Sequence, residues 1–342
     1  MRCSFYIVSK LFNLYVAMAI ASQRRNEKAV VVFVNQPLTG NKDFEQLKSW
    51  KNSPFHESYC FAGHFPGSLS KLKQRKIVFK AIKELIECYR PENIFTGNDR
   101  RMEFQYAMHV ACKLDSSVKG HYMDEGTFTY IGRKPKNAIS QHLDNLLKKI
   151  SYGCWWQEPT TIGASSLVDK VYVAYPDLID KRLKSKDVVG LSSSMFLDED
   201  VVEFSKLLLS THSLDIKSLK NLDAVLTLPH ESLFGDNERY RSHVLETLHR
   251  YGENSAVKYH PRYSEYDLLR LEDEGVTLLP AEAAFESLLM LLPTKTTIIG
   301  DVSSTLLTTR WIRPDLNVIS ESRGGVNRKL ENLFKELDIL IS

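Results

Sequence analysis

Three short polar motifs, each directly after a stretch of apolar residues, contain side chains suited to chemistry. They are Asp124-Glu125-Gly126, His260-Pro261 and Ser303-Ser304-Thr305. A carboxylate can serve as a general base, an imidazole can exchange a proton near neutral pH, and hydroxyl groups at a helix start can bind an anion such as phosphate. Each motif also has a structural explanation: an acidic turn, a loop histidine and a helix N-cap. Their chemistry therefore depends on the elements that position them.

Those elements alternate between strands and helices along the whole chain. Near-continuous apolar, β-branched stretches such as 29–34 are typical of strands in a parallel sheet that is covered on both faces. The predicted strands cover 4–8, 29–34, 93–95, 120–123, 170–174, 188–191, 224–228, 256–259, 276–279, 297–299 and 317–319. The predicted helices cover 11–23, 70–89, 101–112, 137–150, 199–209, 239–251, 266–273, 283–292, 304–311 and 328–341. This pattern predicts an α/β protein with two Rossmann-like domains.

The boundary between the domains is predicted from a break in this alternation. Residues 151–170 are rich in Gly, Pro, Ser and Thr. We therefore expect a first domain over 1–160 and a second over 161–342. Ligands of open α/β sheets bind at the carboxyl ends of the strands, so we expect the three motifs beside a cleft between the domains.

Composition excludes several classes of protein. The 342 residues carry 45 Lys and Arg against 42 Asp and Glu, and a net charge of +3 excludes a nucleic-acid binder that works by bulk charge. The five Cys are scattered without a CxxC pair, which excludes a disulfide scaffold and a cysteine-rich zinc module. Neither GxGxxG nor GxxxxGK[ST] occurs, so assignment to the dinucleotide oxidoreductases or the P-loop proteins lacks its main sequence evidence.

In this order, and on two βα domains, the motifs resemble those of bacterial sialyltransferases and polysialyltransferases of the GT-B type. Those enzymes share a D/E-D/E-G motif in the first domain, an HP motif in the second, and a serine/threonine pair further along. These correspond to Asp124-Glu125-Gly126, to His260-Pro261, and to Ser303-Ser304 with Thr305. Glu282 opens a predicted helix where such enzymes commonly carry an acid facing the nucleotide ribose. Asn98-Asp99-Arg100 is a fourth, less specific point of resemblance.

The resemblance implies a GT-B fold and a glycosyltransferase of capsule or lipooligosaccharide biosynthesis. Sialic acid, or a related nonulosonic acid, would pass from a CMP-activated donor to a glycan hydroxyl, with inversion and without a metal or other cofactor. His260 would protonate or hydrogen-bond the departing phosphate. The other donor-binding residues would be Pro261, Glu282, Ser303, Ser304 and Thr305, and the acceptor-binding residues Asn98, Asp99 and Arg100.

Either Glu125 or Asp124 would be the general base. Neighbouring residues of an extended strand point to opposite faces, so only one of the two carboxylates can face the cleft. We favour Glu125, which stands nearer the turn, with Asp124 bracing it. Arg262, beside the HP motif, either binds a substrate carboxylate or forms a surface salt bridge.

Three alternatives stay open. CMP-Kdo or CMP-pseudaminic acid would use the same machinery as CMP-sialic acid, so no motif separates these donors. A polysialyltransferase would need a basic groove for its polyanionic acceptor, for which Lys71, Arg75, Arg101 and Arg133 are among the candidates. A non-catalytic two-lobed binding protein has a similar cleft, but the acid, His and Ser motifs argue against it.

The sequence also predicts where the protein acts. The apolar run 11–21 follows Lys10 and is too short and interrupted for a membrane span or a secretion signal. We therefore expect a cytoplasmic protein, associated peripherally with the inner membrane. The predicted terminal helix 328–341 carries Leu330, Leu333, Phe334, Leu337, Leu340 and Ile341 on one side. That side either packs on the domains or anchors the protein to the membrane.

Overall fold

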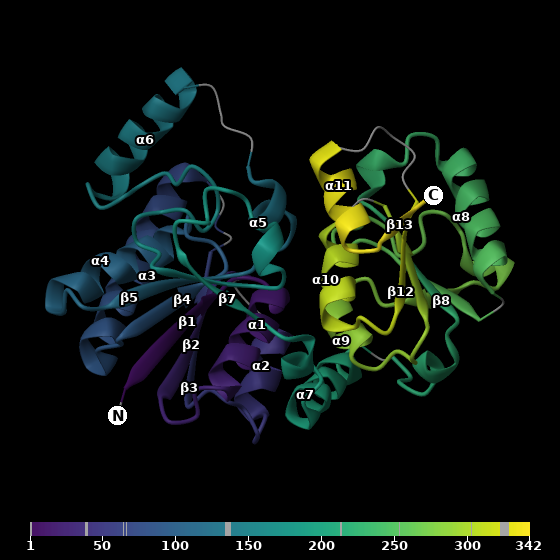
Figure 1. The fold of residues 1–342 in the computed structure, drawn as a ribbon, viewed down its shortest axis with the longest axis horizontal. Helices are drawn as coiled ribbons and strands as arrows, with labels where there is room; N and C mark the ends of the chain where they lie inside the picture. The colour runs from purple at the N-terminus through teal and green to yellow at the C-terminus, as the bar shows by residue number, and fades with distance from the viewer. Residues whose placement is uncertain are drawn as a thin grey trace. The chain divides into compact units, whose positions relative to one another are not determined.

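The computed structural model describes residues 2–37, 40–63, 65, 67–133, 138–212, 214–252, 254–301, 303–321 and 328–342. The chain folds into two compact units, Met1–Ser192 and Ser193–Ser342, and each is built on a parallel sheet covered by helices (Figure 1). Among the described residues, no helix is both long and apolar enough to cross a membrane.

The first unit contains a seven-stranded sheet in the order β3-β2-β1-β4-β5-β6-β7. Its strands are β1 (Cys3–Val8), β2 (Lys28–Gln36), β3 (Glu57–Ala62), β4 (Asn93–Thr96), β5 (Lys119–Met123), β6 (Lys170–Val173) and β7 (Asp187–Gly190). Its helices are α1 (Leu11–Ser22), α2 (Lys42–Ser49), α3 (Ser68–Tyr89), α4 (Met102–Leu114), α5 (Thr127–Ile131) and α6 (Ala138–Tyr152). The strand order reverses between β1 and β4, which is where ligands of such sheets bind.

The core of the first unit explains why the central strands are apolar throughout. All six residues of β1 and the six residues 29–34 of β2 are buried, because helices cover both faces of the sheet. Tyr6 of β1 stacks on Phe95 of β4 with 4.6 Å between ring centroids. Ten of the twelve residues of α1 are buried, as expected for a helix that is apolar on all sides.

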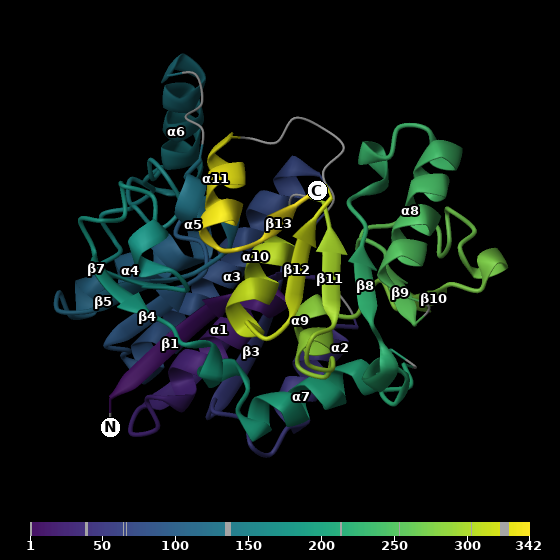
Figure 2. The same ribbon diagram turned by 45° about the vertical axis from the view of Figure 1, so that its right-hand side comes forward.

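The second unit repeats this winding with six parallel strands in the order β10-β9-β8-β11-β12-β13. Figure 2 shows β8, β11 and β12 side by side. The strands are β8 (Ala224–Thr227), β9 (Ser255–Lys258), β10 (Thr277–Leu279), β11 (Thr297–Gly300), β12 (Asn317–Ser320) and β13 (Leu340–Ile341). The helices are α7 (Glu199–Ser210), α8 (Asn237–Tyr251), α9 (Phe285–Leu289), α10 (Ser304–Ile312) and α11 (Arg328–Glu336).

The prediction of two parallel α/β sheets is confirmed, but the predicted boundary at 160/161 is wrong. β6 pairs with β5 and β7 pairs with β6, so residues 161–192 complete the first sheet. The segment rich in Gly, Pro, Ser and Thr is a crossover within the first unit. Its backbone amides at Gly163 and Ser165 each lie 2.8 Å from a carboxylate oxygen of Asp99.

Several predicted elements also differ from the structure. β3, α2 and α5 were not predicted, and the predicted helix 266–273 only overlaps a short 3-10 turn, Glu272–Glu274. The terminal helix ends at Glu336 rather than 341, and the chain then forms the edge strand β13. Leu330, Leu333 and Phe334 of α11 are buried, so their side chains are packed and not presented to a membrane.

Candidate active site

Both carboxylate oxygens of Asp124 accept hydrogen bonds at the turn that follows β5. Its Oδ1 accepts hydrogen bonds of 2.8 Å from the amide of Gly126 and from the hydroxyl of Thr129. Its Oδ2 accepts one from the hydroxyl of Tyr130 and one of 3.0 Å from the amide of Ala174. Burial raises the pKa of Asp124, and these four donors oppose that effect. The carboxylate therefore braces the turn and has no lone pair directed at solvent.

Glu125, the next residue, has a different environment. Its Oε1 lies 3.0 Å from Nζ of Lys10, at the start of α1. Its Oε2 is buried and has no hydrogen-bond partner in the described part of the chain. The side chain as a whole is only 8% exposed. A buried carboxylate oxygen without a hydrogen-bond partner is unfavourable unless a ligand donates a hydrogen bond to it. Glu125 thus offers one free acceptor atom at the carboxyl edge of the sheet.

Asn13 is a second buried group with an unused atom at this edge. Its Oδ1 lies 3.4 Å from the hydroxyl of Ser9, whereas its Nδ2 has no partner among the described residues. Gly97, after β4, allows this packing, because a Cβ there would lie 2.2 Å from Nδ2 of Asn13. The ends of β1, β4 and β5 are adjacent in the sheet, so Asn13, Gly97 and Glu125 belong to the same edge.

The predicted acceptor residues Asn98, Asp99 and Arg100 have mainly structural partners. Asp99 is completely buried, and both its carboxylate oxygens accept backbone amides, so it holds the crossover segment in place; its role as an acceptor ligand stays a prediction. Asn98 accepts the amide of Arg100 in a tight turn. Arg100 donates from Nε to Glu158 at 2.7 Å.

Glu158 is the centre of a basic cluster; the sequence analysis named Arg133 as a candidate for a basic groove but found neither Glu158 nor Lys148. Besides Arg100, Glu158 binds Arg133 at 3.2 Å and Lys148 at 3.1 Å. Burial raises the pKa of Glu158, but Arg100 and Lys148 outweigh burial and hold that pKa below its usual value. Three cations on one carboxylate leave an excess of positive charge. The cluster is therefore suited to an anionic group of a ligand.

In the second unit, His260 follows β9 and lies against a second histidine. Its Nδ1 accepts the amide of Arg262 at 3.2 Å, so the neutral ring carries its proton on Nε2. His230, after the neighbouring strand β8, packs edge-on against it with 5.4 Å between ring centroids. Burial, followed by the charges of His230, Arg262 and Lys258, lowers the pKa of His260. His260 is therefore a neutral hydrogen-bond donor at pH 7.

Ser303 and Ser304 begin α10 directly beyond the end of β11. Ser303 is the N-cap residue, but its side chain makes no capping hydrogen bond, and the first turn of α10 contains no acidic residue. Thr305 is partly buried, and its carbonyl accepts the hydroxyl of Thr309 at 2.8 Å. Free amides and hydroxyls at a helix start can bind phosphate. β8 separates β9 from β11 in the sheet, so the ends of the two strands that precede His260 and Ser303 are roughly 10 Å apart at the same edge.

Lys258 lies at the end of the strand that precedes His260, and Glu282 follows the neighbouring strand β10. Lys258, the last residue of β9, is buried and donates from Nζ to the carbonyl of Ala281 at 2.9 Å. Burial lowers its pKa to about 8, partly offset by Glu286 and Glu282. Glu282 is exposed in the turn before α9. Sequence reasoning missed Lys258, although a lysine at the end of an apolar strand was a usable signal.

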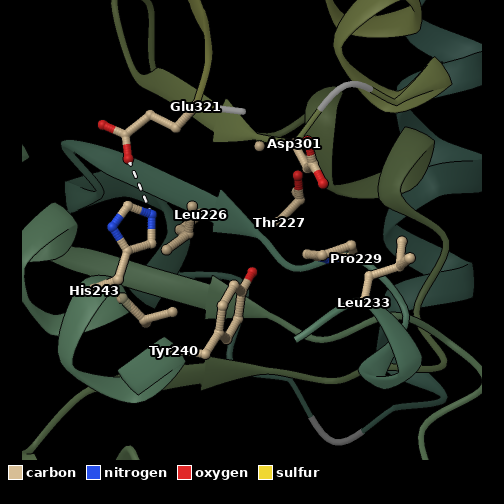
Figure 3. Close-up of a pocket in the computed structure, with 10 residues that line it drawn as sticks. Leu226, Thr227, Pro229, Leu233, Tyr240, His243, Asp301 and Glu321 are labelled. Atoms are coloured by element: carbon tan, nitrogen blue, oxygen red, sulfur yellow. Dashed lines mark ion pairs between the residues drawn. The ribbon is translucent and has the colours of Figure 1, made fainter. Parts of the chain in front are cut away.

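A pocket lies at the reversal of strand order between β8 and β11 (Figure 3). Glu321 and His243 stand on one side of it, 3.5 Å apart, and Thr227 and Asp301 on another. Gly300 is required there, because a Cβ would lie 2.5 Å from Oγ1 of Thr227. Glu321 already pairs with Arg250 at 2.9 Å and accepts the hydroxyl of Thr247 at 2.9 Å. The polar side chains that line the pocket suit the hydroxyl or amino groups of a ligand.

Pro261 and Arg262, beside His260, are both exposed. Arg262 forms no ion pair with any described residue, so the surface salt bridge considered for it is not found there. Among the described residues, no group of three or more His, Cys, Asp or Glu side chains is placed to hold a metal ion.

Comparison with known proteins identifies the family. The family model for alpha-2,8-polysialyltransferase (POLYST) matches residues 4–321. No curated protein matches the sequence significantly.

Solved structures show the same fold. An alpha/beta-galactoside alpha-2,3-sialyltransferase from Photobacterium phosphoreum has a TM-score of 0.61 and 14% identity, over 99% of this chain and 98% of that one. The GT-B domain of a sialyltransferase from Photobacterium damselae has a TM-score of 0.58 and 16% identity, over 100% of both chains. A putative UDP-N-acetylglucosamine 2-epimerase from Listeria monocytogenes has a TM-score of 0.54 and 11% identity, over 97% and 81%.

The expectation of a GT-B sialyltransferase is therefore confirmed. At these identities the solved structures establish the fold, and the family match, which spans most of the chain, establishes the activity. The chain belongs to the alpha-2,8-polysialyltransferase family and is a sialyltransferase of the GT-B type, which moves sialic acid from a nucleotide-sugar donor to a glycan.

Proposed function

We propose that the donor is CMP-sialic acid and that transfer to the glycan hydroxyl is a single inverting displacement without a metal ion. The observation that carries this proposal is the difference between two adjacent carboxylates. Asp124 is saturated by four donors, whereas Oε2 of Glu125 is buried and unpartnered. A general base must keep one lone pair for the proton it removes, and only Glu125 does so.

In the proposed step, the acceptor hydroxyl gives its proton to Oε2 of Glu125. The acceptor oxygen forms a bond to the anomeric carbon from the face opposite the CMP group. The bond from that carbon to the phosphate oxygen breaks, and its electron pair stays on the phosphate. His260 donates a hydrogen bond from Nε2 to this oxygen, and Ser303, Ser304 and the first amides of α10 hold the phosphate. In this proposed step, residues of both units act on one donor molecule.

The groups around this step receive supporting roles. Lys10 holds Oε1 of Glu125 and so leaves Oε2 as the basic atom. Pro261, Glu282 and Thr305 border the donor, and the pocket between β8 and β11 receives an uncharged, hydroxyl- or amino-bearing part of it. Asn98, next to Gly97, stays an acceptor contact in this proposal.

A donor panel tests the proposal. CMP-sialic acid, CMP-Kdo and CMP-pseudaminic acid are each incubated with the enzyme and a glycan acceptor, and released CMP is measured with and without EDTA. We expect release from CMP-sialic acid that EDTA leaves unchanged. Release only from another CMP-sugar would reassign the donor, and loss in EDTA that magnesium restores would refute the metal-free mechanism.

A polymerising activity is favoured by the distribution of charge. The first unit holds 29 of the 45 Lys and Arg but only 18 of the 42 Asp and Glu, so it is strongly basic while the second unit is acidic. A polyanionic acceptor such as a sialic acid oligomer fits a basic unit that also carries the Glu158 cluster. Product length on an oligosialic acid primer distinguishes repeated from single addition.

We also propose that the protein works in the cytoplasm, at the inner membrane face, in capsule or lipooligosaccharide biosynthesis. A peripheral location is supported by the apolar side chains that α6 exposes to solvent.

A further inference from the structure

The helix α6 presents a row of large apolar side chains to solvent. Leu143, Leu146, Leu147 and Ile150 are 57%, 50%, 55% and 74% exposed. Their spacing of three, four and seven residues places all four on one face of the helix. A contiguous exposed apolar face is uncommon on a soluble protein and marks a surface that binds something.

The opposite, polar face of α6 attaches the helix to the first unit. The Tyr152 hydroxyl accepts a hydrogen bond of 3.0 Å from Arg75, and Oδ1 of Asn145 accepts one of 3.3 Å from Nε1 of Trp156. Lys148 pairs with Glu158 and lies over the Trp156 ring. A surface helix normally packs its apolar face inward, and α6 is reversed.

The place of α6 at the rim of the first unit fits an external partner. In Figures 1 and 2 the helix stands at the edge of this unit, away from the sheet. The terminal helix α11, the other amphipathic candidate in the sequence, buries Leu330, Leu333 and Phe334. Between these two helices, α6 is the one with an apolar face available for binding.

The net charge of the first unit favours an anionic lipid surface as the partner. The first unit has a formal net charge of +11, from 29 Lys and Arg and 18 Asp and Glu, and Lys149 beside the apolar row is exposed. An amphipathic helix with cations near its apolar face binds at the boundary between lipid head groups and acyl chains, most strongly where the lipids are anionic. A second copy seated on the same face would bring two strongly positive units together.

We propose that α6 docks the enzyme on an anionic bilayer, with the side chains of Leu143, Leu146, Leu147 and Ile150 inserted below the head groups. This inference deepens the proposed membrane location and does not depend on the identity of the donor. Docking would hold the basic first unit beside a lipid-linked glycan.

Vesicle sedimentation tests the inference with the full-length protein. The wild type is compared with a variant carrying Leu146→Gln and Ile150→Gln, on phosphatidylcholine vesicles with and without phosphatidylglycerol. The matched control is Ile77→Gln, which removes an equally exposed apolar side chain (55%) from α3. CMP release with a water-soluble acceptor serves as the check on folding, because the described contacts of Asn145, Lys148 and Tyr152 on α6 are with Trp156, Glu158 and Arg75 and not with a proposed catalytic group.

We expect the wild type to bind the anionic vesicles and the double variant to bind them at least about tenfold more weakly. Ile77→Gln should bind within about twofold of wild type, and turnover in solution should be equal in all three. Equal vesicle binding by the double variant would overturn the inference, as would failure of the wild type to bind. So would a wild-type dimer that the double variant converts to monomer, because the apolar face would then be a contact between copies.

Discussion

Nζ of Lys10 lies 3.0 Å from Oε1 of Glu125, although 115 positions separate the two residues. Lys10 is the N-cap residue of α1, where the helix dipole disfavours a cation and a polar cap is usual. The first turn of α1 contains no acidic side chain, so Glu125 is the carboxylate that compensates the charge. An ion pair with a lysine that is 59% exposed adds little stability, which leaves positioning of Glu125 as its main effect.

Replacing Lys10 with Met should lower kcat by about tenfold or more and leave the KM for the donor nearly unchanged, because the free base becomes misoriented. Lys10→Arg should recover most of kcat. In combination with Glu125→Gln, Lys10→Met should add no further loss, since Lys10 acts through Glu125. The control is Lys119→Met, which removes a similar exposed ion pair, 3.2 Å from Asp169, at the opposite end of β5. Additive losses in the double variant would exclude the positioning role.

The two carboxylates of the Asp124-Glu125 pair should respond differently to amide substitution. Glu125→Gln keeps the shape of the side chain but removes its basicity, so kcat should fall by about 10²–10⁴-fold with CMP binding unchanged. Asp124→Asn puts an amide among four hydrogen-bond donors, and should destabilise the first unit by roughly 2–4 kcal/mol. Thermal unfolding and single-turnover rates measured on both variants separate these effects. A stable, inactive Asp124→Asn enzyme beside an active Glu125→Gln enzyme would exchange the two roles.

Removing the imidazole of His260 should slow the departure of CMP. His260→Ala should lower kcat by about 10²-fold or more, whereas His260→Gln, whose amide can still donate a hydrogen bond, should retain more activity. The exposed His249 on α8 provides the control, and His249→Ala should turn over like wild type. Activity of His260→Ala above about a tenth of wild type would remove His260 from the mechanism.

The stability of the first unit should fall on acidification because of His121. Burial, followed by the charge of Arg24, lowers the pKa of this histidine to about 4, and its Nε2 pairs with Asn93 at 2.9 Å. Below pH 6.5 the unfolded chain takes up a proton that the folded state excludes until about pH 4. The stabilisation is therefore complete above pH 6.5 and decreases as the pH falls, by about 2 kcal/mol at pH 5.

Urea unfolding at pH 7 and pH 5 measures this dependence. His121→Gln should flatten the difference between the two pH values, while His249→Gln should leave it as in wild type. An unchanged slope in His121→Gln would assign the acid sensitivity to other groups.

Local sequence was sufficient to predict the strands whose residues are all buried alike. β1 and the centre of β2 are buried on both faces, and their continuous apolar residues predicted them within one or two positions. β3 was missed because this edge strand is half-buried and mixes Glu57 and Ser58 with apolar residues. The motifs themselves were found because a polar residue directly after an apolar strand is a local signal.

Relations between distant segments were decided only by the tertiary structure. Whether β6 starts a new sheet or extends the first depends on its pairing with β5, which no residue of β6 encodes alone. From the sequence alone, Asp99 is expected to be an exposed acid in a loop. In the structure its carboxylate accepts hydrogen bonds from the amides of Gly163 and Ser165. The distinction between Asp124 and Glu125 arises in the same way, because hydrogen bonds from Ala174 and α5 saturate one carboxylate while Lys10 binds a single oxygen of the other. The sequence by itself determined which residue types stand at the strand ends; burial and long-range hydrogen bonding decided which of their atoms remain free to react.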